Sequence, residues 1–218
     1  MSESSFPIPA DVARVAALFS AFPHPWALCG GWAVDVWLGR QTRAHHDVDL
    51  VIFAEHQQAL REHFAGWQLV AHDLQWSGDD PVWPGQPIPD RSRWDGRTVT
   101  VPGHFHLRAP DDESFDFEVN LLDREGAEWV LSREPRLALP LTDVIRPCAW
   151  GFDAVAPEVA AYYKVVGVPD ANDLAPQMRP HDIADVGLLV PALPPERLTW
   201  LRAAVATVAP DHPWLADR

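Results

Sequence analysis

The sequence predicts an α/β (α+β) fold in which a mixed sheet is flanked by helices and followed by a helical C-terminal region. Over about the first 150 residues, short β-branched apolar runs alternate with segments of helical periodicity. Glycines and proline-rich turns separate these segments, and only helical patterns follow. We therefore expect a core over residues 1–150 and a helical region over 151–218.

Composition indicates a globular chain. Its 218 residues are 47% hydrophobic and include 11 tryptophans, which excludes a disordered protein. No run of about 18 uncharged apolar residues occurs, and the N-terminus lacks the basic-then-apolar order of a secretion signal. We therefore expect a cytoplasmic protein that contacts no membrane. Its two cysteines, Cys29 and Cys148, are expected to be small buried hydrophobes.

The net charge of −14 bears on possible partners. An acidic surface repels phosphate backbones, so nucleic-acid binding is not expected, whereas a small cationic ligand would be attracted. The alternative is that the charge serves only solubility.

The first segments predict a helix, a strand and a second helix. Apolar residues at helical spacing indicate a helix over residues 12–22, with Asp11 available as a cap after Pro9. "WALCGG" (26–31) is a short buried strand that ends at a glycine pair. A short helix follows, and Gly39 can close it.

The next segments predict further strands and a long loop. "DVDLVIF" (47–53) is a β-branched strand with acids at its start. An amphipathic helix over 54–64 is ended by Gly66, and "WQLVAHDL" (67–74) resumes as a strand. Residues 77–96 are rich in proline and glycine and form a long loop, of a length that is often functional.

The remaining segments complete the prediction. Strands are expected at "RTVTV" (97–101), "HFHLR" (104–108) and "SFDFEVNLLD" (114–123), the last of which alternates polar and apolar residues. The C-terminal helices are expected at 157–166, 181–190 and 195–208.

Asp47 and Asp49 stand at the head of a buried strand. Residues two apart on a strand point to the same face, so the two carboxylates can share a cation, with Val48 facing the core between them. Like charges held this close are costly unless a positive group lies between them, and Mg2+ prefers such oxygen ligands. Alternatively, the pair is an ordinary solvated strand end.

A third carboxylate can join this pair from a neighbouring strand. In "SFDFEVN" the polar residues Asp116, Glu118 and Asn120 share one face. If this strand lies beside 47–53, one of its acids joins the first two. A polar outer face on an edge strand would give the same pattern.

The glycine pair offers a place for phosphate. Gly30 and Gly31 permit a turn that presents successive backbone N–H groups, and the helix that follows adds its positive end. Glycine pairs are also common in plain tight turns, but this one lies between a strand and a helix shortly before the acid pair.

These motifs together resemble a known family. The stretch "GGWAVDVWLGRQTRAHHDVDL" resembles the signature of the aminoglycoside and lincosamide nucleotidyltransferases, within the DNA polymerase beta-type nucleotidyltransferase superfamily. "PEVAAYYK" and "MRPHDIADVGLLVPAL" also resemble the C-terminal part of such proteins. The resemblance is best over 26–53, moderate over 114–126 and 157–190, and poor over 70–112.

The resemblance implies transfer of a nucleoside monophosphate from an NTP, such as ATP, to a hydroxyl group. It implies that Asp47 and Asp49 hold Mg2+ and that a third acid serves as a metal ligand or as the base. Asp116 is the first choice for this acid and Glu118 the reserve, so the implied catalytic residues are Asp47, Asp49, Asp116 and Glu118, with the first three as metal ligands.

The resemblance also implies nucleotide-binding residues: Gly30, Gly31, Trp32, Arg40, Arg43 and Lys164. Lys164, the single lysine of the chain, occupies the family's "YK" position, although it could be a surface residue. The arginines could instead pair with Asp35. We expect His45 and His46 not to be metal ligands, and Asp182 and Asp185 to contact arginines rather than metal.

The acceptor is left open by two departures from the family. The lincosamide-modifying relatives have Asp-x-His on the third-acid strand, where this chain has Glu118 as the second polar residue, and the loop 77–96 does not match. A small hydroxylated, cationic acceptor such as an aminoglycoside fits the acidic charge. The alternatives are a protein or RNA acceptor, as in toxin–antitoxin nucleotidyltransferases, or a non-catalytic nucleotide-binding module.

Overall fold

The computed structural model describes residues 6–71, 104–110, 112, 115–131, 134–167 and 178–216. The predicted loop at 77–96 and the predicted strand at 97–101 lie outside these residues. None of the described helices combines the length and the apolar character that crossing a lipid bilayer would require.

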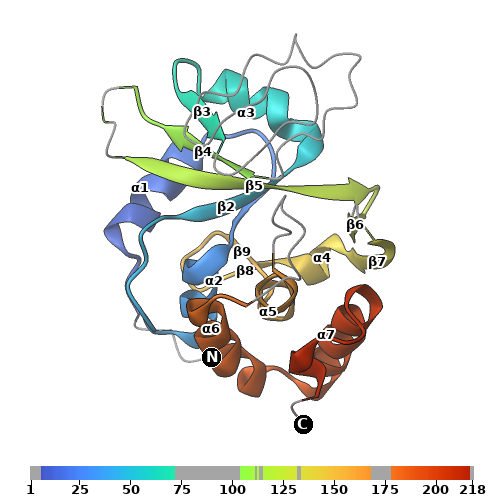
Figure 1. Cartoon of the computed structure of the whole chain (residues 1–218). Coiled ribbons are helices and arrows are strands. Elements are labelled where there is room, and N and C mark those ends of the chain that lie inside the picture. Colours follow the sequence, from blue (N-terminus) through green and yellow to red (C-terminus); the bar gives the residue numbers. More distant parts are fainter. Residues whose placement is uncertain are drawn as a thin grey trace.

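The described strands form one mixed sheet, as predicted. Its main order is β3-β4-β5-β2-β1-β9-β8, and β6 pairs with both β5 and β7 (Figure 1). Strand β1 is antiparallel to β2 and parallel to β9, and β2 is parallel to β5. The strands are β1 Trp26–Leu28, β2 Asp49–Phe53, β3 Gln68–Ala71, β4 His104–Arg108, β5 Asp116–Glu125, β6 Glu128–Leu131, β7 Glu134–Pro140, β8 Ile145–Pro147 and β9 Asp153–Val155.

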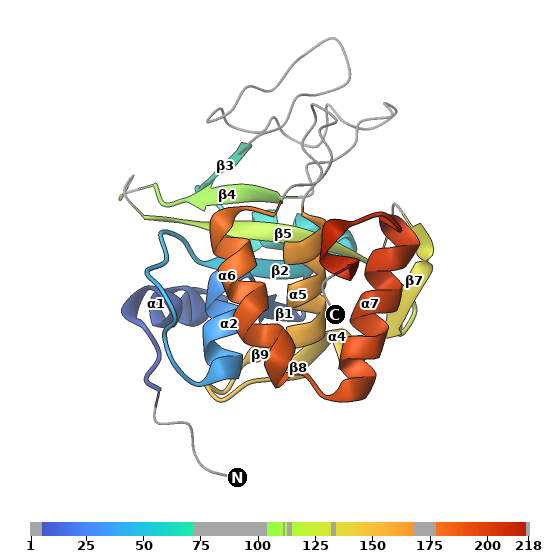
Figure 2. The ribbon, with the colours of Figure 1, turned by 60° about the horizontal axis from the view of Figure 1, so that its bottom comes forward.

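Helices cover both faces of this sheet. Helices α1 and α3 lie on one face, whereas α2, α5, α6 and α7 lie on the other (Figures 1 and 2). The helices are α1 Ala10–Phe19, α2 Gly30–Leu38, α3 Gln57–His63, α4 Leu141–Val144, α5 Pro157–Val166, α6 Pro180–Leu189 and α7 Pro195–Val208, with short 3-10 turns at Ala54–His56, Val190–Ala192 and Pro213–Leu215.

Strand β2 is buried on both faces, which explains its continuous apolar run. Leu50 and Ile52 belong to the core cluster that also contains the apolar residues of α1 and α3. Val51 and Phe53 belong to the cluster built with α5, α6 and α7. By the same alternation, Asp49 points toward the side of α2 and α5.

Strand β5 alternates as the sequence predicts. Phe117 and Val119 are completely buried in the α1/α3 cluster. Glu118 and Asn120 therefore face the side of α2 and α5. The parallel pairing of β2 with β5 thus brings the acids of both strands to the same face of the sheet.

The predicted C-terminal helices are confirmed, with α5 and α7 at the expected bounds and α6 displaced by one residue. Each of these helices begins with a proline, which suits the first helical turn because its missing N–H would have no helical partner there. The cap predicted for the first helix is wrong. Pro9 is the N-cap, and Asp11 lies inside the first turn, where its charge favours the helix dipole.

Strands β6 to β9 were not predicted. Strands β6, β8 and β9 are runs of three or four residues, which carry little periodicity, and the seven residues of β7 include two prolines, which argue against a strand. Strand β9 pairs with β1, and β8 pairs with β9. The boundary near residue 150 falls between β8 and β9 and stays a prediction.

Candidate active site

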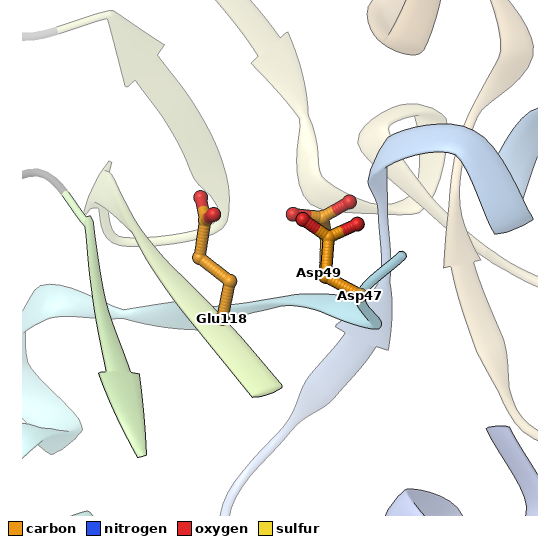
Figure 3. Close-up of side chains that lie close together, drawn as sticks. All are labelled: Asp47, Asp49 and Glu118. Carbon is orange, nitrogen blue, oxygen red and sulfur yellow. The ribbon is translucent and has the colours of Figure 1, made fainter. Parts of the chain in front are cut away.

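Three carboxylates converge at the start of β2. Oxygen atoms of Asp47, Asp49 and Glu118 lie within 4.8 Å of one another. Asp49 and Glu118 are register partners on the parallel strands β2 and β5, and Asp47 comes from the turn just before β2. Figure 3 shows the three side chains projecting from the same side of these strands. Among the described residues, this is the group of acids with the spacing of a metal site.

The structure brings Glu118, rather than the first choice Asp116, to this cluster. Both side chains point to the same face of β5, but Asp116 lies two positions earlier, beyond the first residue of β2. Its carboxylate lies 3.4 Å from Nδ1 of His106 on β4, whereas the distance from Glu118 to the Nε2 atom of that histidine is 3.9 Å. Alternation along β5 places Asp116 and Glu118 on the same face, and the register with β2 determines that Glu118 is the one beside Asp49.

Crowding shifts the protonation of the cluster. Burial, followed by the charges of Glu118 and Asp47, raises the pKa of Asp49 to about 8, against the opposing charges of Lys164 and Arg179. Burial and the neighbouring acids also raise the pKa of the Cys29 thiol. Asp49 is thus a carboxylate that lacks enough positive charge around it to stay ionised at neutral pH.

The glycine pair is required by close contacts. Gly30 has φ +61°, a conformation that favours glycine, and a Cβ atom there would overlap the Asp49 carboxylate. A Cβ atom at Gly31 would overlap the His45 imidazole and lie 2.6 Å from Arg43. The start of helix α2 therefore packs directly against the acid cluster, so the first N–H groups of the helix lie beside these carboxylates.

A buried aspartate holds the segment that leads into β2. Asp35, which is fully buried, accepts hydrogen bonds from the backbone N–H and the side chain of Thr42. It also lies 2.6 Å from Nε2 of His45. Sequence reasoning missed these contacts, although a buried acid on a helix followed by Thr and His could have suggested them. His45 therefore contacts Asp35 and helps to hold the segment that carries Asp47. His46 is exposed.

Trp32 acts on the acids through the backbone. Its indole Nε1 donates a 3.1 Å hydrogen bond to the carbonyl oxygen of Asp47, and its ring lies 4.1 Å from that of His45. The side chain is almost fully buried. Trp32 therefore orients Asp47. Its expected contact with the nucleotide stays a prediction.

The predicted cations have different surroundings. Arg43 pairs with Asp185 on α6 rather than with Asp35, through Nε at 3.2 Å and Nη2 at 3.1 Å. Lys164 on α5 is buried, and its Nζ lies 2.8 Å from Asp185 and 3.0 Å from Asp182. The side chain of Arg40 is exposed. The expected contacts between α6 aspartates and arginines are present.

The donor set fits a hard divalent cation. Three carboxylates within reach of one point offer only oxygen ligands, which Mg2+ prefers, and the raised pKa of Asp49 indicates that positive charge is lacking there. A cation at this point would also remove the repulsion among the three acids. Asp47, Asp49 and Glu118 are therefore the residues that could hold it.

One sequence family matches the segment that contains part of this site. Residues 11–77 match the family described as aminoglycoside-2''-adenylyltransferase. This segment contains the glycine pair together with Asp47 and Asp49, and Glu118 lies beyond it. No curated protein sequence matches the chain.

Solved structures share the fold. Antibiotic-resistance factor ANT(2'')-Ia has a TM-score of 0.56 and 18% identity, with 91% of this chain and 90% of that chain covered. A complex of ANT(2'')-Ia with adenylyl-2''-tobramycin gives 0.54 and 19%, with 90% and 95% covered. The lincomycin-bound lincosamide adenylyltransferase LnuA gives 0.51 and 16%, with 84% and 96% covered.

Over residues 11–77 the chain is therefore similar in sequence to the aminoglycoside-2''-adenylyltransferase family, and over most of its length it shares the fold of aminoglycoside and lincosamide nucleotidyltransferases.

Proposed function

We propose that this protein transfers a nucleoside monophosphate, from ATP in the first instance, to a hydroxyl group of a small cationic acceptor of the aminoglycoside class, with Mg2+ as cofactor. The single observation that carries the proposal is the convergence of Asp47, Asp49 and Glu118 within 4.8 Å beside the Gly30–Gly31 helix start. Carboxylates for a cation and backbone N–H groups for a phosphate are the two parts that such a transfer needs.

The residues divide into two roles. Asp47, Asp49 and Glu118 would hold Mg2+, which when bound neutralises charge on the triphosphate and the reacting phosphorus. The helix start at Gly30 and Gly31 would accept phosphate oxygens through its N–H groups.

A base for the acceptor hydroxyl is available on the same strand as Glu118. Asp116 faces the same side of β5 but stands apart from the acid cluster, so it is free of a metal ligand's role and can accept the proton. Its neighbour His106, with Nδ1 at 3.4 Å, would stabilise that carboxylate in position.

The acceptor class follows from charge and from the relatives. A net charge of −14 attracts polycationic ligands and repels RNA. A related structure contains adenylyl-2''-tobramycin, and another is lincomycin-bound. Of these two chemistries, the polycationic one gains more from an acidic protein, so we place aminoglycosides before lincosamides.

A product assay tests the proposal. Purified protein is incubated with ATP or GTP, Mg2+ and a panel of aminoglycosides and lincosamides, and pyrophosphate release is measured together with the mass of the acceptor. The expected result is a mass increase of one nucleoside monophosphate on an aminoglycoside, dependent on Mg2+.

The controls separate the alternatives. Asp49→Asn should remove turnover, and Asp123→Asn, an exposed acid further along β5, should retain it. Modification of a protein or RNA in place of the antibiotics would contradict the acceptor class. Nucleotide binding without release of pyrophosphate from the NTP, whichever acceptor is supplied, would contradict the catalytic assignment.

A further inference from the structure

Beside the acid cluster, three cations and two aspartates form a row. Arg43 contacts Asp185 at 3.1 Å, and Asp185 contacts Lys164 at 2.8 Å. Lys164 contacts Asp182 at 3.0 Å, and Asp182 contacts Nε of Arg179 at 2.7 Å. We call these five residues the α6 charge row, because both aspartates lie on one side of helix α6.

The aspartates of this row are fixed and ionised. Their side chains are only 4% and 1% exposed, for Asp182 and Asp185 respectively. Burial by itself would raise the pKa of each, but hydrogen bonds from an arginine and the charge of Lys164 outweigh it and lower the pKa of both. Each aspartate therefore holds two cations in place, and the row retains one net positive charge.

Arg179 differs from the other cations in its exposure. It occupies the N-cap position of α6, and its side chain is 69% exposed, compared with 9% for Lys164 and 29% for Arg43. Its hydrogen bonds to described residues use Nε and Nη2, both toward Asp182, so Nη1 is available to a ligand. A guanidinium held on one side by a buried acid is well prepared to bind an anion on the other.

Arg179 also acts on the acid cluster. Its hydrogen bond with Asp182, followed among other causes by the charges of Asp49 and Glu118, raises its pKa. Conversely, the charge of Arg179 is one of those that oppose the rise in the pKa of Asp49. The guanidinium is therefore within electrostatic reach of two of the three acids, although no direct ion pair joins them among the described residues.

We propose that Arg179 is a third cation of the triphosphate site, which binds the pyrophosphate portion of the nucleotide while Asp182 positions its guanidinium. The inference rests on the proposed function. In the transfer, the acceptor oxygen bonds to the α-phosphorus and its proton passes to Asp116. The bond from that phosphorus to the bridging oxygen breaks, and its electron pair stays on pyrophosphate. Arg179 stabilises this negative charge through N–H···O hydrogen bonds from Nη1, while Nε stays bonded to Asp182.

Substitution of Arg179 tests this role. Charge-assisted hydrogen bonds contribute about 1.5–3 kcal/mol, which corresponds to roughly 10- to 140-fold. We expect Arg179→Gln to raise the KM for MgATP and the inhibition constant of inorganic pyrophosphate by about 10-fold or more, while the acceptor KM stays unchanged. Arg179→Lys should recover part of the loss because it retains the charge but lacks the planar fork.

Two further variants separate binding from structure. Arg136→Gln removes an arginine that is 74% exposed and pairs with Glu134 on β7, so it should leave both constants unchanged. Asp182→Asn should weaken pyrophosphate inhibition as Arg179→Gln does, because the guanidinium is no longer held. Thermal unfolding checks that each variant is folded.

The outcomes distinguish this inference from the proposed function. If the wild-type protein releases pyrophosphate and Arg179→Gln keeps both constants within about twofold, Arg179 is not a phosphate ligand and the inference is overturned. If the wild-type protein neither binds MgATP nor is inhibited by pyrophosphate, the proposed function fails, and the inference fails with it.

Discussion

Two regions of the molecule compensate the charge of their carboxylates in opposite ways. At the first turn of α5, Glu158 is 1% exposed and its Oε1 atom meets the guanidinium groups of Arg146 and Arg197. Arg197 also contacts Asp143 at 2.9 Å. We call these four residues the Glu158 network. In the acid cluster of Asp47, Asp49 and Glu118, by contrast, carboxylates face one another.

The difference separates structural charges from functional ones. In the Glu158 network the cations belong to the chain, so the hydrogen bond from Arg197 can lower the pKa of Asp143. In the acid cluster the nearest cations are already held by Asp182 and Asp185, and the pKa of Asp49 rises. A group of acids that the chain leaves without full compensation is a candidate site for a ligand's positive charge.

The largest expected effect comes from removing one charge of the acid cluster. Asp47→Asn or Asp49→Asn should lower kcat/KM by about 1,000-fold or more, because the loss of a metal ligand removes several kcal/mol of transition-state stabilisation. The midpoint of thermal unfolding without metal should stay the same or rise, since repulsion is relieved. Pyrophosphate release and calorimetry measure the two quantities, and a large loss of stability would contradict the assignment.

The second prediction concerns pH. Because the pKa of Asp49 is about 8 in the folded protein, its protonated form favours folding, and this contribution is lost as pH rises toward and through 8. Mg2+ competes with that proton, so its affinity should rise by about 50-fold between pH 6 and pH 8. Titration calorimetry with Mg2+ at several pH values measures this slope, and Asp49→Asn should abolish it.

Without metal, the melting temperature should fall between pH 6 and pH 9 more steeply in the wild-type protein than in Asp49→Asn. Equal slopes would show that Asp49 already ionises freely in the folded protein.

The third prediction concerns the Glu158 network, where a substitution should change stability rather than activity. Glu158→Gln should lower the free energy of unfolding by about 2–3 kcal/mol, between the values typical of buried and of exposed ion pairs, because both arginines are partly exposed. Urea unfolding measures the loss. Glu128→Gln, an exposed glutamate on β6, is the matched control and should change stability little. A 1,000-fold loss of activity in folded Glu158→Gln would contradict a purely structural role.

The smallest effect is expected from substituting a glycine, and a comparison of two glycines tests it. Gly30 and Gly126 have nearly the same φ, +61° and +60°. A Cβ atom at Gly30 would overlap Asp49, whereas one at Gly126 would meet open space. Each change to Ala should cost about 1–2 kcal/mol of stability. Gly30→Ala should also reduce Mg2+ affinity by about tenfold, because a Cβ atom displaces the carboxylate. Equal Mg2+ affinity in both variants would show that this contact has no function.

Much of the fold could be predicted because local pattern and tertiary structure agree. Strand β2 is β-branched, and helices α5 and α7 begin at prolines and follow clear apolar periodicity. The short strands β8 and β9 could not be predicted, because their identity depends on pairing at the edge of the sheet beside β1. The local sequence of β8 and β9 does not indicate that β1 is nearby.

The candidate site was predictable in part for the same reason. The spacing of Gly30, Asp47 and Asp49 is local, so sequence placed them together. The choice between Asp116 and Glu118 depends on the register of two strands that are distant in sequence, and alternation cannot decide it. Long-range pairs such as Arg43 with Asp185 were likewise beyond local pattern.

The parallel pairing of β2 with β5 has a consequence for the order of folding. Asp49 and Glu118 are about 70 positions apart, so their strands meet only after a long loop has closed, at an entropic cost. The electrostatic repulsion between Glu118 and the two aspartates arises only when that pairing forms. A divalent cation that relieves it should therefore slow the opening of the finished sheet more than it accelerates the early collapse of the chain.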